Sequence, residues 1–105
     1  MEERPEAASL VQLLDELATA MPGIECVAVA GRVEYRRDGR SVALRGPTEL
    51  RFRVGRAVAA AALTTPGARR APEGAEWVAL GIGAADRFSM DRVRAWFELA
   101  ARGGR

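Results

Sequence analysis

The sequence predicts an α+β protein in which an antiparallel sheet of about five strands packs against helices. Near both ends of the chain, apolar residues recur at three- and four-residue steps, which is typical of amphipathic helices. Between them, apolar and polar residues alternate over short runs separated by tight turns, which favours an antiparallel meander. The predicted order is α-β-β-β-β-α-β-α, and the 105 residues suit a single domain spanning residues 1–105.

Three segments are predicted as helices. The first covers residues 6–21, carries a leucine stripe and ends at Pro22-Gly23. The second covers residues 56–64 and is rich in alanine, which has a high helix propensity. The third has Ser89 as its candidate N-cap and ends at Gly103-Gly104.

The remaining ordered segments are predicted as strands joined by short turns. Asp38-Gly39 is the strongest hairpin signal, and Gly46-Pro47 marks the next turn. Residues 66–74 hold two prolines and two glycines and are predicted to form a loop. The predicted strands cover residues 24–30, 32–37, 41–45, 49–54 and 76–82.

The apolar faces of these helices and strands predict one shared core. Each helix contributes one stripe, and each strand contributes every second residue. The residues that we expect to be buried together are Leu13, Leu14, Leu17, Val42, Leu44, Phe52, Val54, Val78, Leu80, Val93 and Phe97.

The composition excludes several kinds of chemistry. All 16 basic residues are Arg, and the chain contains no His, Lys or Asn. It therefore has no histidine base or imidazole ligand and no amine for a Schiff base. The only cysteine, Cys26, can form neither an internal disulfide nor a thiolate zinc site, and its apolar strand predicts a buried, unreactive thiol. We expect a non-enzymatic protein with no catalytic residue, no metal and no cofactor.

Two further motifs are best explained by structural roles. Gly81-Ile82-Gly83 is the nearest approach to a phosphate-binding turn, but a dinucleotide fingerprint requires a third glycine where Asp86 stands. Glu73, Glu76, Asp86 and Asp91 could supply an acid-base or metal site only if they converged. A loop and a helix start exposed to solvent are the favoured interpretation of these carboxylates.

The arginines provide the main functional hypothesis. Strand alternation places Arg51 and Arg53 together on one face of the sheet, and we expect Arg36 and Arg45 to join them there. A further pair lies in the predicted loop. Because Arg binds phosphate groups bidentately, the candidate nucleic-acid contacts are Arg36, Arg45, Arg51, Arg53, Arg69 and Arg70.

The alternative interpretation of these arginines is a solvated sheet face without a nucleic-acid role. The net charge is only +2, and few aromatic residues are available to stack on bases. The deciding feature is whether Glu34 and Glu49 interleave with the arginines and neutralise them.

Several stretches, taken in order and spacing, resemble the MmcQ/YjbR family of small bacterial proteins. The resemblance covers about Leu10 to Arg102. Gly39-Arg40 stands where the family has a Gly-Lys turn, and residues 26–30 are apolar where relatives are often polar or His-bearing. The matching stretches are residues 17–25 (opening helix and Pro-Gly turn), 33–40 (hairpin), 50–54 (strand), 65–72 (Pro-Gly-x-Arg-Pro segment), 77–80 (Trp-Val strand) and 93–101 (closing helix).

The resemblance implies a CyaY-like fold with a curved antiparallel sheet packed against helices. The family is often labelled a double-wing DNA-binding type. A weaker resemblance, over the strand-helix-strand-helix ending, is to a small domain named luciferase-like.

Together these observations predict a bacterial, cytoplasmic binding module without a membrane anchor. The N-terminus lacks the layout of a signal peptide, and the longest nearly uncharged apolar stretch, residues 57–65, is shorter than the ~20 residues of a membrane span. Nucleic acid is the expected ligand. The alternative is a protein-interaction or small-ligand-binding domain that uses the sheet face or residues 66–74.

Overall fold

The computed structural model describes residues 6–82 and 87–103. Gly83, Asp86 and Gly104, named in the motifs above, lie outside the described residues. Within those two ranges, no helix is long and apolar enough to cross a membrane. The elements are α1 (Glu6–Ala20), β1 (Ile24–Val29), β2 (Arg32–Arg37), β3 (Arg40–Arg45), β4 (Glu49–Arg53), α2 (Arg56–Ala62), β5 (Ala68–Arg70), β6 (Trp77–Gly81) and α3 (Arg87–Ala101).

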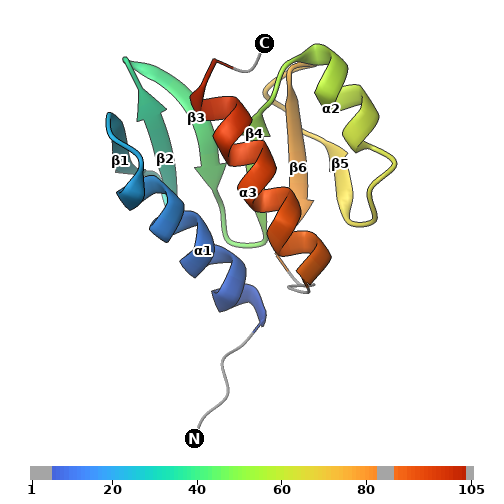
Figure 1. Ribbon diagram of the computed structural model, residues 1–105, viewed down its shortest axis with the longest axis horizontal. Helices are drawn as coiled ribbons and strands as arrows, with labels where there is room; N and C mark the ends of the chain where they lie inside the picture. Colours follow the sequence, from blue (N-terminus) through green and yellow to red (C-terminus); the bar gives the residue numbers. More distant parts are fainter. Residues whose placement is uncertain (1–5, 83–86, 104–105) are drawn as a thin grey trace, which may run out of the picture.

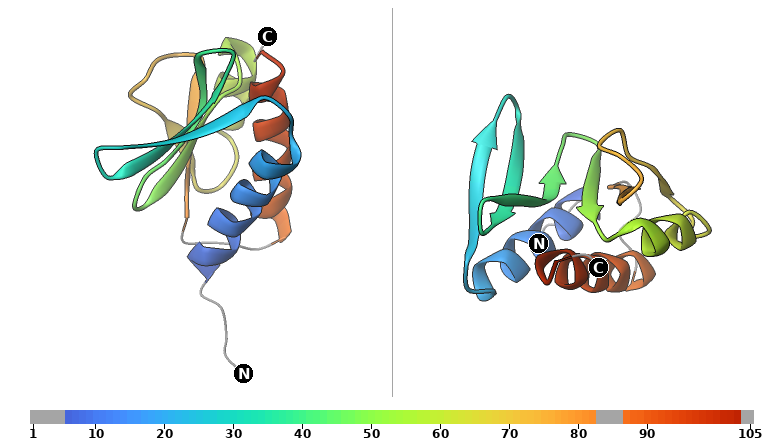
Figure 2. Two further views of the ribbon diagram at one scale, coloured as in Figure 1. Left: turned by 90° about the vertical axis from the view of Figure 1, so that its left-hand side faces the viewer. Right: turned by 90° about the horizontal axis from the view of Figure 1, so that it is seen from above.

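The strands form one antiparallel sheet in the order β1-β2-β3-β4-β6-β5. α1, α2 and α3 all lie against the same face, which leaves the opposite face free of helices (Figures 1 and 2). The predicted α+β class and antiparallel sheet are confirmed. The structure adds one strand, β5, inside the predicted loop at residues 66–74. Its three residues are too few for alternation to reveal them in the sequence.

The first two hairpins have the tightest turns in the sheet. Asp38 and Gly39 both have positive φ, 55° and 78°, and so do Ala30 and Gly31, at 50° and 83°. Positive φ at both central residues is the requirement of a type I′ turn, whose twist matches that of the flanking strands. The Asp38-Gly39 hairpin prediction is therefore confirmed, and Ala30-Gly31 forms a second hairpin of the same kind.

A bulge in β3 changes the direction of its side chains. Tyr35 pairs with Ala43 and Arg36 with Ser41, so Val42 is an extra residue between the two pairs. Both Val42 and Ala43 join the core under the helices. The next residue, Leu44, therefore faces the open side of the sheet. The prediction that Leu44 shares the core with Val42 is wrong, although Leu44 is buried.

The core fills the space between the helices and the sheet. Leu17 is only half-buried at its border, and the other nine predicted core residues, Leu44 aside, are in it. Tyr35, which sequence analysis did not place there, is fully buried and packs edge-on against Phe97, with ring centroids 6.1 Å apart. Phe52 meets Trp96 at the same centroid distance.

Two local predictions are wrong. α3 begins at Arg87, so Ser89 lies within its first turn and is not the N-cap. Cys26 is exposed because it lies on β1, which is an edge strand and pairs only with β2. Its apolar neighbours in sequence belong to this edge strand, in which Ile24 packs against the core but Ala28 and Val29 are exposed.

Candidate ligand site

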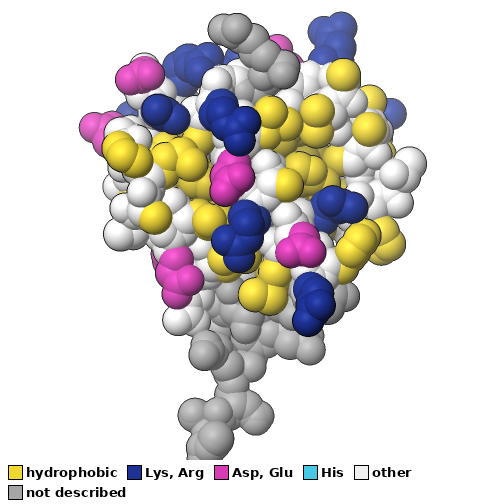
Figure 3. Space-filling model, viewed as in Figure 1, with side chains coloured by type: hydrophobic (Ala, Val, Ile, Leu, Met, Phe, Trp, Pro, Cys, Tyr) yellow, Lys and Arg dark blue, Asp and Glu magenta, His cyan; other side chains and the backbone are white. Residues whose placement is uncertain are grey.

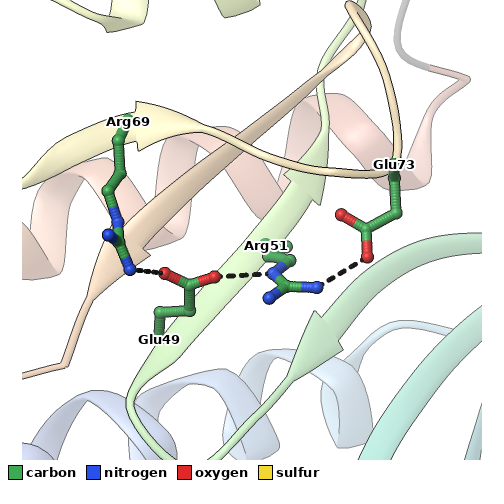
Figure 4. Close-up of polar contacts among 4 residues, drawn as sticks. All are labelled: Glu49, Arg51, Arg69 and Glu73. Atoms are coloured by element: carbon green, nitrogen blue, oxygen red, sulfur yellow. Dashed lines mark hydrogen bonds and ion pairs between the residues drawn. The ribbon is translucent and has the colours of Figure 1, made fainter.

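The open face of the sheet carries a chain of ion pairs made by the predicted arginines. Glu49 is buried, with one carboxylate oxygen accepting from Arg69 and the other accepting from Arg51 Nε at 2.7 Å. Arg51 Nη1 then donates to Glu73 at 2.8 Å (Figure 4). Arg69 and Arg51 both face this side because the register places each of them opposite Ala79 of β6.

These contacts change the acidity of the groups involved. Burial raises the pKa of Glu49, but hydrogen bonds from Arg69 and Arg51 outweigh it, so the net pKa lies below its ordinary value. The hydrogen bond to Glu49 in turn raises the pKa of Arg51. The carboxylate is therefore held ionised between two permanent cations.

Two more arginines on this face are paired with carboxylates. Arg36 contacts Glu34 at 3.0 Å, and Arg53 Nε donates to Glu76 at 2.8 Å. The hydrogen bond from Arg36 lowers the pKa of Glu34. Glu34 and Glu49 thus interleave with the arginines, which is the arrangement that disfavours a phosphate-binding face.

Arg45 does not lie on the open face, contrary to the prediction. It follows Leu44 beyond the β3 bulge and pairs in register with Val33 and Leu50, which pack on the helix side. Its Nε donates to the hydroxyl of Tyr35 at 3.4 Å, and this bond raises the pKa of Arg45. The bulge therefore separates Arg45 from the other predicted contacts.

Arg70, the last of the predicted residues, lies on β5 opposite Val78 of the core and so faces the helix side. There it lines a cavity of about 250 Å³, which we call the α2 cavity. Arg56 at the start of α2 lines the same cavity, and neither arginine forms an ion pair with a described residue. The other lining residues are Ala59, Ala60, Leu63, Ala71, Gly74, Ala75 and Trp77.

A second cavity, of about 340 Å³, lies next to the first, and Arg56 lines both. Arg40 and Arg53 also line it, together with one carboxylate, that of Glu76. Glu76 is already paired with Arg53, whereas Arg40 has no ion-pair partner in the described part of the chain. Arg56 therefore shares one cavity with the unpaired Arg70 and the other cavity with the unpaired Arg40.

Arg56 and Arg40 were not among the arginines that the sequence pattern indicates as ligand contacts. Arg56 begins an alanine-rich helix, and Arg40 follows a hairpin turn, positions that are typical of exposed structural arginines. Only the tertiary fold brings the start of β3 and the start of α2 to one cavity. No local signal in the sequence identifies them.

On the side covered by α1 and α3, basic and acidic side chains are interspersed with hydrophobic ones (Figure 3). Of the predicted carboxylates, Glu73 and Glu76 are paired with Arg51 and Arg53, and Asp86 lies outside the described residues. Among the described residues, no group of three or more His, Cys, Asp or Glu side chains could hold a metal ion.

Comparison with known proteins finds no match to a family model, a curated protein or a solved structure. The resemblance to the MmcQ/YjbR family and the CyaY-like fold that it implies stay predictions. The fold and the site therefore define the protein as an α+β sheet protein with helices on one face and an arginine-bordered cavity beside α2.

Proposed function

We propose that the protein is a small, non-enzymatic binding module whose ligand is an organic anion held in the α2 cavity. The observation that carries this proposal is the pair Arg56 and Arg70, which border one cavity with no carboxylate among its lining residues. Guanidinium groups bind carboxylates and phosphates through parallel hydrogen bonds, and an unpaired guanidinium loses no existing partner on binding.

The remaining walls indicate the rest of the ligand. Leu63, Trp77 and several alanines supply apolar surface, with Trp77 half-buried at the cavity. Pockets for drug-sized ligands usually measure about 300–1,000 Å³. The α2 cavity, at about 250 Å³, lies below that range and suits one anionic group with a small apolar or aromatic substituent.

The geometry supports this ligand better than nucleic acid on the open sheet face. Four of the six predicted contacts, Arg36, Arg51, Arg53 and Arg69, are already paired with carboxylates. A phosphate backbone would have to compete with those carboxylates for each guanidinium. Nucleic acid therefore becomes a comparison arm of the experiment.

Titration followed by tryptophan fluorescence tests the proposal, because Trp77 lines the cavity. The probes are inorganic phosphate, phenyl phosphate and benzoate. We expect phenyl phosphate to bind more tightly than phosphate, since the apolar wall contributes only to the first. Replacing Arg56→Gln or Arg70→Gln should weaken binding by about tenfold or more, in line with the loss of a charge-assisted hydrogen bond.

Arg94→Gln is the matched control, because Arg94 is exposed on α3 and lines neither the α2 cavity nor the second cavity. Equal binding by the Arg56, Arg70 and Arg94 variants would reject the site. Failure of all three probes to bind wild-type protein would also reject it. A mixed-sequence DNA duplex at low salt forms the other arm. Steeply salt-dependent DNA binding that survives Arg56→Gln and Arg70→Gln would favour the sheet face instead.

A further inference from the structure

The two edges of the sheet differ in how well they are protected against strand pairing. β5 has three residues, two of them Arg, and lies between Pro66 and Pro72. Short length, positive charge and nearby proline are the usual protections of an edge strand. β1 is twice as long and carries no positive charge, with Glu25 as its single charge, and it has a nearby proline, Pro22, on one side only.

β1 is also accessible. Glu25, Cys26, Ala28 and Val29 are exposed, and Val29 at 38% is one of two large hydrophobic residues exposed in the described chain. The β1–β2 hairpin extends away from the helix layer (Figure 2). Because β1 pairs only with β2, every second residue directs its backbone N–H and C=O outward, and no described backbone group bonds to that outer edge.

We propose that β1 pairs antiparallel with β1 of a second copy of this chain, so that two six-stranded sheets become one continuous sheet. A twofold axis through Val27 gives a register that covers β1 from Glu25 to Val29 in both copies. Val27 then faces its own counterpart, Cys26 faces Ala28 and Glu25 faces Val29. Residues directly opposite each other in an antiparallel pair share one face, so both helix layers lie on the same side.

The side-chain pattern of β1 favours a second copy as the occupant. In this register the only charge on the strand, Glu25, never meets itself, and the central contact is between two valines. β-branched cross-strand pairs stabilise a sheet, whereas like charges directly opposite each other destabilise it. A twofold contact of this kind is self-complementary and requires no other surface. It lies at the opposite edge from β5 and α2, so it does not cover the α2 cavity (Figure 1).

Sedimentation velocity of the whole chain under reducing conditions, from about 1 to about 300 µM, tests the contact through its concentration dependence. We expect wild-type protein to shift from monomer to dimer. Val27→Lys places two positive charges opposite each other and should weaken the dimer by about tenfold or more. Ala61→Lys, on an exposed position of α2 that lines neither the α2 cavity nor the second cavity, adds the same charge and should leave the dimer unchanged.

A cysteine cross-link tests the register without altering charge. In a Cys26→Ser background, Val27→Cys should form a disulfide-linked dimer under mild oxidation, because directly opposed Cα atoms lie within the range that a disulfide spans. The same background without the Val27 change is the control. A wild-type chain that stays monomeric throughout, a Val27→Lys variant that dimerises normally, or a Val27→Cys variant that does not cross-link would each overturn the proposal.

Discussion

The hydroxyl of Tyr35 donates a 2.7 Å hydrogen bond to the carboxylate of Asp15, which joins β2 of the sheet to α1. The same hydroxyl accepts from Arg45, so one phenol connects a carboxylate and a guanidinium at the edge of the core. Burial, followed by the hydrogen bond to Asp15, raises the pKa of Tyr35 above its ordinary value, against the opposing effect of Arg45. The phenol is therefore a neutral donor throughout the physiological range.

Tyr35→Phe should destabilise the protein by about 1.5–3 kcal/mol, the usual contribution of a hydrogen bond to a charged partner, while the ring itself is kept. The ring contact with Phe97 remains, so the loss reports on the hydroxyl alone. Urea denaturation measures the change. Asp15→Asn retains an acceptor and should cost less. A Tyr35→Phe variant as stable as wild type would show that the connection between α1 and the sheet contributes nothing to folding.

Glu49 should make the protein sensitive to acid. Its folded-state pKa lies below the reference value of 4.5, so its stabilising contribution is present above that pH and is lost as the pH falls through the folded pKa. Glu49→Gln should therefore flatten the fall in melting temperature between about pH 5 and about pH 3. Glu16→Gln, on the exposed side of α1, is the matched control. If the melting temperatures of wild type and Glu49→Gln fell in parallel with pH, Glu49 would not be the source of the acid sensitivity.

Truncating buried side chains should distinguish the two faces of the sheet. Phe52→Ala and Phe97→Ala each remove a fully buried ring and should cost about 3–5 kcal/mol, most of the stability of a small domain. Leu44→Ala removes a buried side chain on the open face, outside the core cluster. Because the surface there can relax, its cost should fall at or below the low end of the about 2–5 kcal/mol range for Leu→Ala. Equal losses for Phe52→Ala and Leu44→Ala in urea denaturation would contradict this division.

Most of the fold was predictable from the sequence because its signals are local. The helix stripes, the alternation of β2 and β4 and the Asp38-Gly39 turn each lie within a few residues, and all three agree with the structure. The failures begin where one residue depends on a distant one. The bulge at Val42 arises from pairing between β2 and β3, and it reverses the faces of Leu44 and Arg45 relative to simple alternation.

The candidate site was less predictable for the same reason. Arg51 and Arg53 lie on the expected face, and Glu49 is a local partner of Arg51. The remaining partners of these two arginines, Glu73 and Glu76, are more than twenty residues away. Arg56 and Arg70 meet at one cavity only because β5 pairs with β6 beside α2. Ion pairs between residues far apart in the chain and the lining of a cavity are properties of the tertiary fold, so the local sequence does not display them.

Cys26 should react with a thiol reagent in the native state, in contrast to the buried thiol that the sequence predicts. The side chain is exposed on β1, but desolvation and then the nearby carboxylate of Asp15 raise its pKa above the reference value of 9.0. Since the thiolate is the reactive form, the labelling rate of folded monomer should still be rising with pH at about pH 9. Asp15→Asn should increase the rate at about pH 8 by removing the repulsion between carboxylate and thiolate.

Labelling without denaturant, followed by absorbance, measures both effects, and an exposed thiol should react completely. Labelling that occurs only in urea would show that Cys26 is buried. Equal labelling rates for Asp15→Asn and wild type would show that the Asp15 carboxylate does not raise the pKa of the thiol. Pairing of two β1 strands places Cys26 inside the contact, so the rate should also fall as protein concentration rises. Because the Val27→Lys variant keeps Cys26 but weakens the pairing, its labelling rate should fall only at higher protein concentrations than that of wild type.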